Sequence, residues 1–234
     1  FIIMIDQIEY KVLARKYRPQ TFADLIGQET LVQILSNAIT SNRIANAYLL
    51  TGVRGVGKTT TARLIAMSLN CENKKQDNCE PCGSCDSCKS IRSDHHLDVI
   101  EMDAASKTGV DDVREIIDNV KYKPVNCIFK IFIIDEVHML SKSAFNALLK
   151  TLEEPPEHVK FIFATTEVKK IPVTILSRCQ RFDLKRVESK DLTQHLKKIS
   201  ELEKVKINED AISLLVRAGD GSVRDSLSLL DQAI

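Results

Sequence analysis

The chain has 234 residues, which is enough to bury a substantial core and more than the commonest single domain contains. Its 33 Lys and Arg residues nearly balance 32 Asp and Glu residues, which gives a net charge of +1. This balance excludes the attraction of a polyanion by a positive field over the whole molecule. There is no apolar run of transmembrane length, and a cluster of five among the seven cysteines is typical of thiols that hold a metal in a reducing cytosol.

Strands and helices are expected to alternate in the first four-fifths of the chain. Short apolar runs predict strands at 46–51, 97–102, 128–134 and 159–164, with a candidate fifth at 180–184. Apolar residues that recur every three or four positions predict helices at 60–69, 110–120 and 143–154. This alternation predicts an α/β domain built on a doubly wound parallel sheet.

The pattern changes to helices only after about residue 185. One apolar stripe consists of Leu192, Leu196, Ile199 and Leu202, and a second of Ala211, Leu214 and Leu215. Ser222 and Asp225 are spaced as a capping box that opens a last helix. We therefore expect two domains, an α/β domain over 1–186 and a small all-helical domain over 187–234.

A phosphate-binding loop follows the first predicted strand. Residues 52–59 match the pattern G-x-x-x-x-G-K-[ST] at every constrained position, between a strand and a helix as the motif requires. Lys58 is expected to reach the β- and γ-phosphates of a nucleotide, and the Thr59 hydroxyl to bind Mg²⁺. The predicted nucleotide-binding residues are Gly52, Val53, Arg54, Gly55, Val56, Gly57, Lys58, Thr59 and Thr60.

Acidic and hydroxyl residues stand at the ends of two later strands. Asp135 and Glu136 follow the most apolar strand at its carboxyl end, where ligands bind in such sheets. Asp135 is expected to complete the Mg²⁺ shell, and Glu136 to orient and deprotonate the attacking water. Thr165 and Thr166 end the next strand, so either hydroxyl could reach the γ-phosphate or the water.

The five clustered cysteines follow the helix of the phosphate-binding loop. They are Cys71, Cys79, Cys82, Cys85 and Cys88, at spacings of 8, 3, 3 and 3. Four thiolates form a closed tetrahedral Zn²⁺ site, so one cysteine is spare. An iron–sulfur cluster is the rival, but the ferredoxin-type run ends in Cys-Pro, whereas here a lysine follows the last cysteine.

Other polar residues carry weaker signals. Lys107 and Thr108 precede the helix at 110–120, so they would either bind a backbone phosphate or remain solvated. The spacing of Arg178 and Arg224 does not separate them from ordinary surface arginines. The isolated Cys127 and Cys179 are expected to be part-buried thiols. The pair His95 and His96 is expected in a solvated loop.

Several short strings occur in an order that resembles one family. They are Ala14-Arg-Lys-Tyr-Arg-Pro19, Phe22-Ala-Asp-Leu-Ile-Gly-Gln28, the phosphate-binding loop, Cys82-Gly-Ser-Cys-Asp-Ser-Cys88, Asp135-Glu-Val-His138, Asn146-Ala-Leu-Leu-Lys-Thr-Leu-Glu-Glu-Pro155, Ser177-Arg-Cys179 and Gly221-Ser-Val-Arg-Asp225. The chain resembles the bacterial DNA polymerase III tau/gamma subunits, the motor ATPases of the sliding-clamp loader in the AAA+ class. The resemblance covers nearly the whole chain.

The resemblance implies roles that spacing does not give. Arg178 resembles an arginine finger that acts in trans on a neighbouring subunit's ATP, Arg224 resembles the lid arginine at the γ-phosphate, and Thr166 resembles the sensor at the strand end. The adenine side is implied to contact Ala14, Tyr17 and Arg18. The implied zinc module, about 71–88, uses Cys71, Cys82, Cys85 and Cys88 and leaves Cys79 spare. A longer stretch between Cys71 and Cys82 than in the family keeps Cys71 and Cys79 open as the fourth ligand.

The resemblance also implies a function. The expected protein is an AAA+ ATPase with ATP, Mg²⁺ and Zn²⁺, acting in the cytoplasm at the nucleoid within the DNA-directed DNA polymerase III holoenzyme. Its expected partners are the other clamp loader subunits in a hetero-oligomeric ring, the sliding clamp, primer–template DNA, and the polymerase and helicase through a collar and C-terminal region expected beyond residue 234. The alternatives are a related AAA+ remodeller, such as a branch-migration helicase, and a structural loader subunit that binds no nucleotide.

Overall fold

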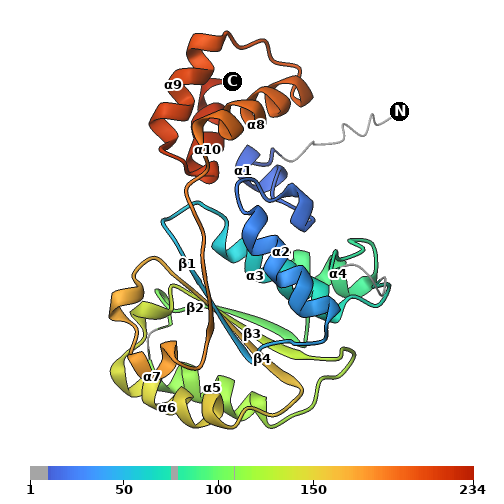
Figure 1. The fold of residues 1–234 in the computed structure, drawn as a ribbon, viewed down its shortest axis with the longest axis vertical. Coiled ribbons are helices and arrows are strands. Elements are labelled where there is room, and N and C mark those ends of the chain that lie inside the picture. Colours follow the sequence, from blue (N-terminus) through green and yellow to red (C-terminus); the bar gives the residue numbers. More distant parts are fainter. Residues whose placement is uncertain (1–9, 75–78, 108) are drawn as a thin grey trace, which may run out of the picture. The chain divides into compact units, whose positions relative to one another are not determined.

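The chain divides into two compact units (Figure 1). The computed structural model describes residues 10–74, 79–107 and 109–234. One unit is formed by residues 19–186, and the other joins residues 10–18 to residues 187–234. Residues 10–18 therefore belong to a different unit than the sequence predicted, since the prediction placed them in the α/β domain.

A five-stranded parallel sheet forms the centre of the larger unit, in the order β2-β3-β4-β1-β5. The strands are β1 (Ala47–Thr51), β2 (Val99–Asp103), β3 (Lys130–Asp135), β4 (Val159–Thr165) and β5 (Gln180–Asp183). All five were predicted. In the register Thr51 pairs with Thr165 and Asp103 with Asp135, so the carboxyl ends of four strands meet at one edge.

Helices cover both faces of this sheet, which confirms the doubly wound arrangement (Figure 1). One apolar core lies between the sheet and the helices α2 (Glu29–Thr40) and α3 (Lys58–Asn70). The other core lies against α5 (Val110–Val120), α6 (Lys142–Glu153) and α7 (Val173–Leu176). Successive residues of β3 alternate between the two cores because neighbouring side chains of a strand point to opposite faces. The described residues of this unit also form three short 3₁₀ helices: Phe22–Asp24, Val137–Met139 and Val168–Lys170.

Helix α3 is buried nearly all round, because the cysteine-rich segment packs on the side that the sheet does not cover. Leu64 and Met67 share a core with Cys79, Cys88 and Ile91. Residues 71–88 show no periodicity in the sequence, yet the structure forms α4 (Asp86–Arg92) there. Two turns are too short for an apolar stripe, and the helix is capped by a thiol: Cys85 Sγ accepts from the Cys88 N–H at 3.4 Å.

The smaller unit is all-helical, as predicted. It contains α8 (Ser189–Leu202), α9 (Glu209–Gly219) and α10 (Val223–Ala233), together with the single turn α1 (Leu13–Lys16). The segment of residues 10–18 joins this unit because Leu13 is buried there and its N–H approaches Asp231 Oδ1 at 3.4 Å. Ser222 Oγ caps α10 by accepting from the Asp225 N–H at 3.2 Å. No helix in the described ranges is long and apolar enough to cross a membrane.

The sequence prediction is wrong for two residues of this unit that it placed in buried apolar stripes. Leu202 is 57% exposed and Leu214 is 66% exposed. The buried face of α9 is instead Ile212, Val216 and Gly219, spaced four and three apart. Gly219 fixes this face, since a Cβ there would lie 1.9 Å from Ser226 Oγ on α10.

Candidate nucleotide site and cysteine module

The phosphate-binding loop turns sharply between β1 and α3. Gly57, the residue that precedes α3, has a φ of +100°. Residues other than glycine rarely adopt this backbone conformation. A Cβ on Gly52 would lie 2.7 Å from the carbonyl oxygen of Leu184. Glycine is therefore required at both constrained positions, and the loop leads directly into the amide end of a 13-residue helix.

Lys58 lies inside this loop and is only 6% exposed. Its Nζ donates to the carbonyl oxygens of Gly52 and Val53, each at 3.0 Å. Burial lowers the pKa of the Lys58 ammonium, while the nearby Glu136 and Asp135 carboxylates act in the opposite direction. The loop thus concentrates positive charge beside two acidic side chains.

The first helical turn and the end of β3 are joined by a side-chain hydrogen bond. Thr59 Oγ1 donates to Asp135 Oδ2 at 2.5 Å, and Asp135 Oδ1 accepts from the Glu136 N–H at 2.9 Å. A hydroxyl and a carboxylate are the hard oxygen ligands that Mg²⁺ prefers. The structure brings together these two residues, which are 76 positions apart in sequence.

Glu136 lies at the same edge in a strained backbone conformation, with a φ of +46°. Its Oε2 accepts from the backbone N–H of Thr166 at 3.2 Å and from the hydroxyl of Thr166 at 3.0 Å. Thr165 is buried and instead contacts His138 Nδ1 through Oγ1, at 2.9 Å. Of the two threonines left open by the sequence, Thr166 is therefore the one that reaches Glu136.

His138 belongs to this group, although sequence reasoning assigned it no role. Its Nδ1 lies 3.3 Å from Glu136 Oε2, and its Nε2 lies 3.5 Å from Glu167 Oε1. The 3₁₀ helix Val137–Met139 turns the chain back so that this side chain faces the end of β4. A turn of three residues leaves no periodic signal, so only the structure reveals the contact.

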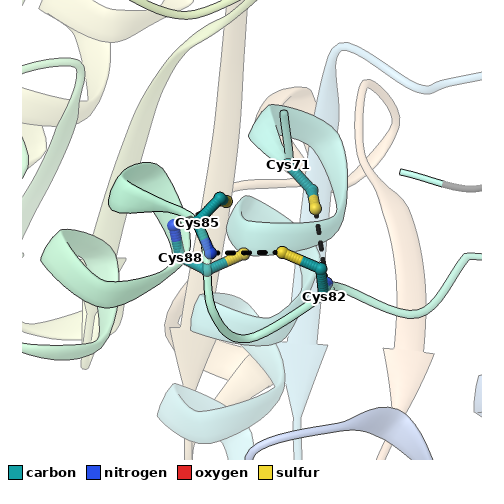
Figure 2. A group of neighbouring side chains, drawn as sticks. All are labelled: Cys71, Cys82, Cys85 and Cys88. Atoms are coloured by element: carbon teal, nitrogen blue, oxygen red, sulfur yellow. Dashed lines mark hydrogen bonds between the residues drawn. The ribbon is translucent and has the colours of Figure 1, made fainter. Parts of the chain in front are cut away.

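Four cysteines form a compact group beside α3 and α4 (Figure 2). The Sγ atoms of Cys71, Cys82, Cys85 and Cys88 all lie within 4.8 Å of one another. Cys79 is outside this group and is buried in the core, where its carbonyl oxygen accepts from Ser68 Oγ. Of the two cysteines left open by the sequence, Cys71 belongs to the group and Cys79 does not.

Backbone amides point at the sulfur atoms of this group. The N–H groups of Cys82 and Cys85 donate to the Sγ atoms of Cys71 and Cys82, both at 3.3 Å (Figure 2). The N–H groups of Cys85 and then Ser84 lower the pKa of the Cys82 thiol to about 6, which favours the thiolate. Sulfur atoms about 2.3 Å from a tetrahedral Zn²⁺ lie about 3.8 Å apart, so this donor set fits one such ion.

The module is also bonded to the segment that precedes α2. Glu80 Oε2 accepts from the Phe22 N–H at 2.8 Å, and Glu80 Oε1 accepts from the Ala23 N–H at 3.0 Å. Residues 71–92 therefore contact both α3 and the 3₁₀ helix Phe22–Asp24.

A second group, His96, Asp98 and Cys127, also has metal-ligand chemistry, but its hydrogen bonds serve the fold. His96 Nδ1 accepts from the Asp98 N–H at 3.0 Å, which leaves the ring proton on Nε2, beside Cys127 Sγ at 3.3 Å. The Asp98 carboxylate accepts from two backbone N–H groups, those of Val125 and Asn126. His95 is exposed, Cys127 and Cys179 are part-buried, and burial raises the pKa of Cys179 to about 12.

For several predicted site residues, the described contacts within their own unit do not include the phosphate-binding loop. Arg178 lies after α7, where its guanidinium donates to Glu153 Oε1 and to the Thr174 carbonyl, each at 2.6 Å. Ala14, Tyr17, Arg18 and Arg224 belong to the smaller unit, in which the Tyr17 hydroxyl donates to Glu203 Oε1 at 2.5 Å. Their predicted roles therefore remain predictions.

The predicted phosphate contact before α5 gains no support. Thr108 lies outside the described residues, and Lys107 is exposed. The first turn of α5 contains Asp111 and Asp112, and Asp112 Oδ2 accepts from the Gly109 N–H at 3.2 Å. Carboxylates already complement the amide end of this helix and would repel a phosphate.

Two family models match consecutive parts of the chain. One, described as DNA polymerase III, delta subunit, matches residues 27–188, and one, described as DNA polymerase III clamp loader subunit, ATPase lid domain, matches residues 191–234. The chain belongs to the DNA polymerase III clamp loader family. It is 54% identical to the tau/gamma subunit of Haemophilus influenzae and to the tau subunit of Escherichia coli, and 51% identical to the tau subunit of Bacillus subtilis, in each case over 97% of this chain. It spans 33%, 35% and 40% of the lengths of these clamp loader family members.

Solved structures extend the likeness to the fold. RuvB of Thermotoga maritima, titled a Holliday junction branch migration motor, has a TM-score of 0.64 and 20% identity over 92% of this chain and 64% of that one. A variant form of the same RuvB gives a TM-score of 0.65 at 19% identity, with the same coverage. At this identity the likeness shows a shared fold alone. The clamp loader family members are more than twice as similar in sequence.

Proposed function

We propose that this chain is the ATP-hydrolysing motor region of a DNA polymerase III clamp loader subunit. Residues 19–186 would form the ATPase domain, and residues 187–234 with 10–18 the lid. The observation that carries the proposal is the meeting of Lys58, Thr59, Asp135, Glu136 and Thr166 at one edge of the sheet, in a chain that belongs to the clamp loader family.

Each of these residues has a chemical task in this proposal. Lys58 and the amide end of α3 would bind the β- and γ-phosphates of ATP. Thr59 and Asp135 would hold Mg²⁺, which neutralises phosphate charge when bound. Glu136 would accept the proton of the attacking water, and Thr166 would hold the Glu136 carboxylate through two hydrogen bonds.

The remaining loop residues, Gly52, Val53, Arg54, Gly55, Val56, Gly57 and Thr60, would surround the phosphates. Ala14, Tyr17 and Arg18 would contact the adenine side, and Arg224 the γ-phosphate, from the lid. Arg178 would act on the ATP of a neighbouring subunit, where a finger of this kind contributes about 10³ to 10⁵ in rate. Its contact with Glu153 supports this proposal, because it holds the guanidinium at a defined place on the domain surface.

The cysteine module would hold Zn²⁺ through Cys71, Cys82, Cys85 and Cys88 and serve the fold rather than the reaction. The fit of four thiols to one tetrahedral ion supports this proposal, as do the N–H groups that stabilise thiolates. Cys79 would remain a core thiol. The module packs on α3, and none of its described contacts includes Asp135 or Glu136.

The proposed partners follow from the family. They are the other loader subunits in a hetero-oligomeric ring, the sliding clamp and primer–template DNA, with polymerase and helicase bound by regions that longer family members contain. ATP binding would close the ring around an open clamp on DNA, and hydrolysis would release both. This work would take place in the cytoplasm at the nucleoid.

The test is nucleotide binding and turnover by the full-length protein assembled with the other loader subunits. We expect labelled ATP to bind with Mg²⁺, and clamp with primed DNA to accelerate hydrolysis. Arg178→Ala should slow hydrolysis without loss of ATP binding. A protein that binds no ATP would be a structural subunit, and turnover indifferent to clamp and primed DNA would indicate another kind of remodeller; either result overturns the proposal.

A further inference from the structure

His138 is a buried side chain between the ends of β3 and β4 and is only 6% exposed. One ring nitrogen, Nδ1, lies 2.9 Å from Thr165 Oγ1 and 3.3 Å from Glu136 Oε2. The other, Nε2, lies 3.5 Å from Glu167 Oε1. The imidazole therefore lies between Glu136, which is proposed to accept the proton of the water, and Thr165 at the end of β4.

Both ring nitrogens of His138 face a carboxylate oxygen, Nδ1 that of Glu136 and Nε2 that of Glu167. An unprotonated Nδ1 would place a lone pair against a carboxylate oxygen, which is repulsive. Thr165 Oγ1 already accepts from the Glu167 N–H at 3.0 Å, so the threonine hydroxyl is held in place as a further neighbour of the ring. With a proton on Nδ1, His138 donates to Thr165 Oγ1 and keeps the positive edge of the ring beside Glu136 Oε2.

All the described hydrogen bonds and ion pairs of the Glu136 carboxylate end on Oε2. Thr166 supplies two donors, its N–H and its hydroxyl, and His138 Nδ1 makes an ion-pair contact at 3.3 Å. A carboxylate with two hydrogen bonds and an ion-pair contact on one oxygen is restricted in rotation and can present its other oxygen, Oε1, to a water molecule. Thr166 approaches from the residue that follows β4, whereas His138 approaches from the turn that follows Glu136 itself.

We infer that His138 is a positioning residue for hydrolysis, which aligns the Glu136 carboxylate through the ion-pair contact between Nδ1 and Oε2. The inference rests on the proposed function, because it assigns the aligned carboxylate to the attacking water. The local backbone supports it: Glu136 has a φ of +46°, and the Met139 N–H donates to the Glu136 carbonyl at 2.9 Å, so a strained, hydrogen-bonded turn places the imidazole beside the carboxylate.

The test compares three substitutions of His138 in the full-length protein within the assembled loader. Asparagine carries an amide nitrogen at the position of Nδ1, glutamine carries one near the position of Nε2, and leucine carries none. We expect His138→Leu and His138→Gln to lower kcat by about tenfold or more, since small misplacement of a reacting group costs up to about 10². His138→Asn should recover most of the loss, and KM and ATP affinity should stay within about twofold in all three.

A matched control is His158→Asn at the opposite, amino end of β4, where His158 Nε2 lies 3.3 Å from the Val120 carbonyl oxygen. We expect it to leave kcat unchanged. Wild-type kcat in His138→Leu would overturn the inference, and so would equal losses in His138→Leu and His138→Asn. Parallel losses of ATP affinity and melting temperature would overturn it too, because they would show a merely structural role. A wild-type protein that hydrolyses no ATP would instead overturn the proposed function.

Discussion

The two ends of helix α3 carry two kinds of site. Its first turn closes the phosphate-binding loop at Lys58, and its last residue, Asn70, is followed by Cys71 of the cysteine module. A helix of 13 residues is about 20 Å long, so the sites are separated by the length of one helix. The first joins residues that are 76 and 30 positions apart, while the sulfur contacts of the second span only 3 or 11 positions.

This contrast shows how each site is specified. The nucleotide edge exists because parallel strands end together, so it depends on the topology of the whole domain. The cysteine module depends on short loops and on the metal that we propose for it. Damage to the first should therefore remove chemistry from an intact fold, and damage to the second should weaken the fold before it alters chemistry.

The strongest loss should occur at the phosphate-binding loop. Lys58→Ala should weaken ATP binding by about 100-fold or more, because a charge-assisted hydrogen bond contributes up to about 3 kcal/mol. Equilibrium binding of labelled ATP with Mg²⁺ measures this. The zinc content and the melting temperature without nucleotide should stay near wild type, and a lost zinc ion would contradict the separation of the two sites.

The next effect is on stability. Cys85→Ser should release zinc and destabilise the domain by roughly 2 kcal/mol, since metal binding is linked to folding. For a protein of this size that corresponds to a melting temperature about 4–8 °C lower. Cys79→Ser is the matched control at a buried cysteine outside the group, and it should keep the full zinc content. Zinc loss from the control alone would contradict the assignment of Cys71.

A weaker effect should follow from a change at the end of β4. Thr166→Val removes the hydroxyl that donates to Glu136 Oε2 but keeps the backbone N–H contact. One hydrogen bond to a charged group is worth about 1.5 kcal/mol, so kcat should fall about tenfold at unchanged ATP affinity. Thr166→Ser keeps the hydroxyl and should recover the rate; a valine variant with wild-type kcat would show that the contact is unused in turnover.

The weakest effect concerns the proposed arginine finger. Glu153→Gln removes the charge that faces Arg178 in a pair whose side chains are 31% and 51% exposed. Exposed ion pairs contribute up to about 1 kcal/mol, so hydrolysis by the assembled loader should change less than about fivefold. Arg178→Ala should cost far more in the same assay. Equal losses in both variants would mean that the pair acts as a unit.

Much of the fold could be predicted from the sequence, because its signals are local and repeated. Apolar runs located all five strands, and the change of pattern near residue 185 located the helical unit. The misplaced residues, Leu202 and Leu214, lie in amphipathic helices whose buried face depends on the partner helix. Residues 10–18 were misplaced because a single helical turn that packs on distant residues carries no sequence signal of its own.

The candidate site was only partly predictable for the same reason. Lys58, Thr59, Asp135 and Glu136 lie in motifs with fixed chemistry, so their types and spacing were informative. The choice between Thr165 and Thr166, and between Cys71 and Cys79, depends on which side chain points toward a partner. The role of His138 depends on a three-residue turn after a strained glutamate, which no periodicity reveals.

Our central proposal is that hydrolysis takes place at the edge formed by Lys58, Asp135 and Glu136, separately from the cysteine module. The decisive experiment is ATP turnover by the assembled loader containing Glu136→Gln, with zinc content and ATP affinity determined on the same sample. We predict turnover lower by about 10² or more, with a full zinc content and wild-type ATP affinity. Wild-type turnover in this variant would contradict the assignment.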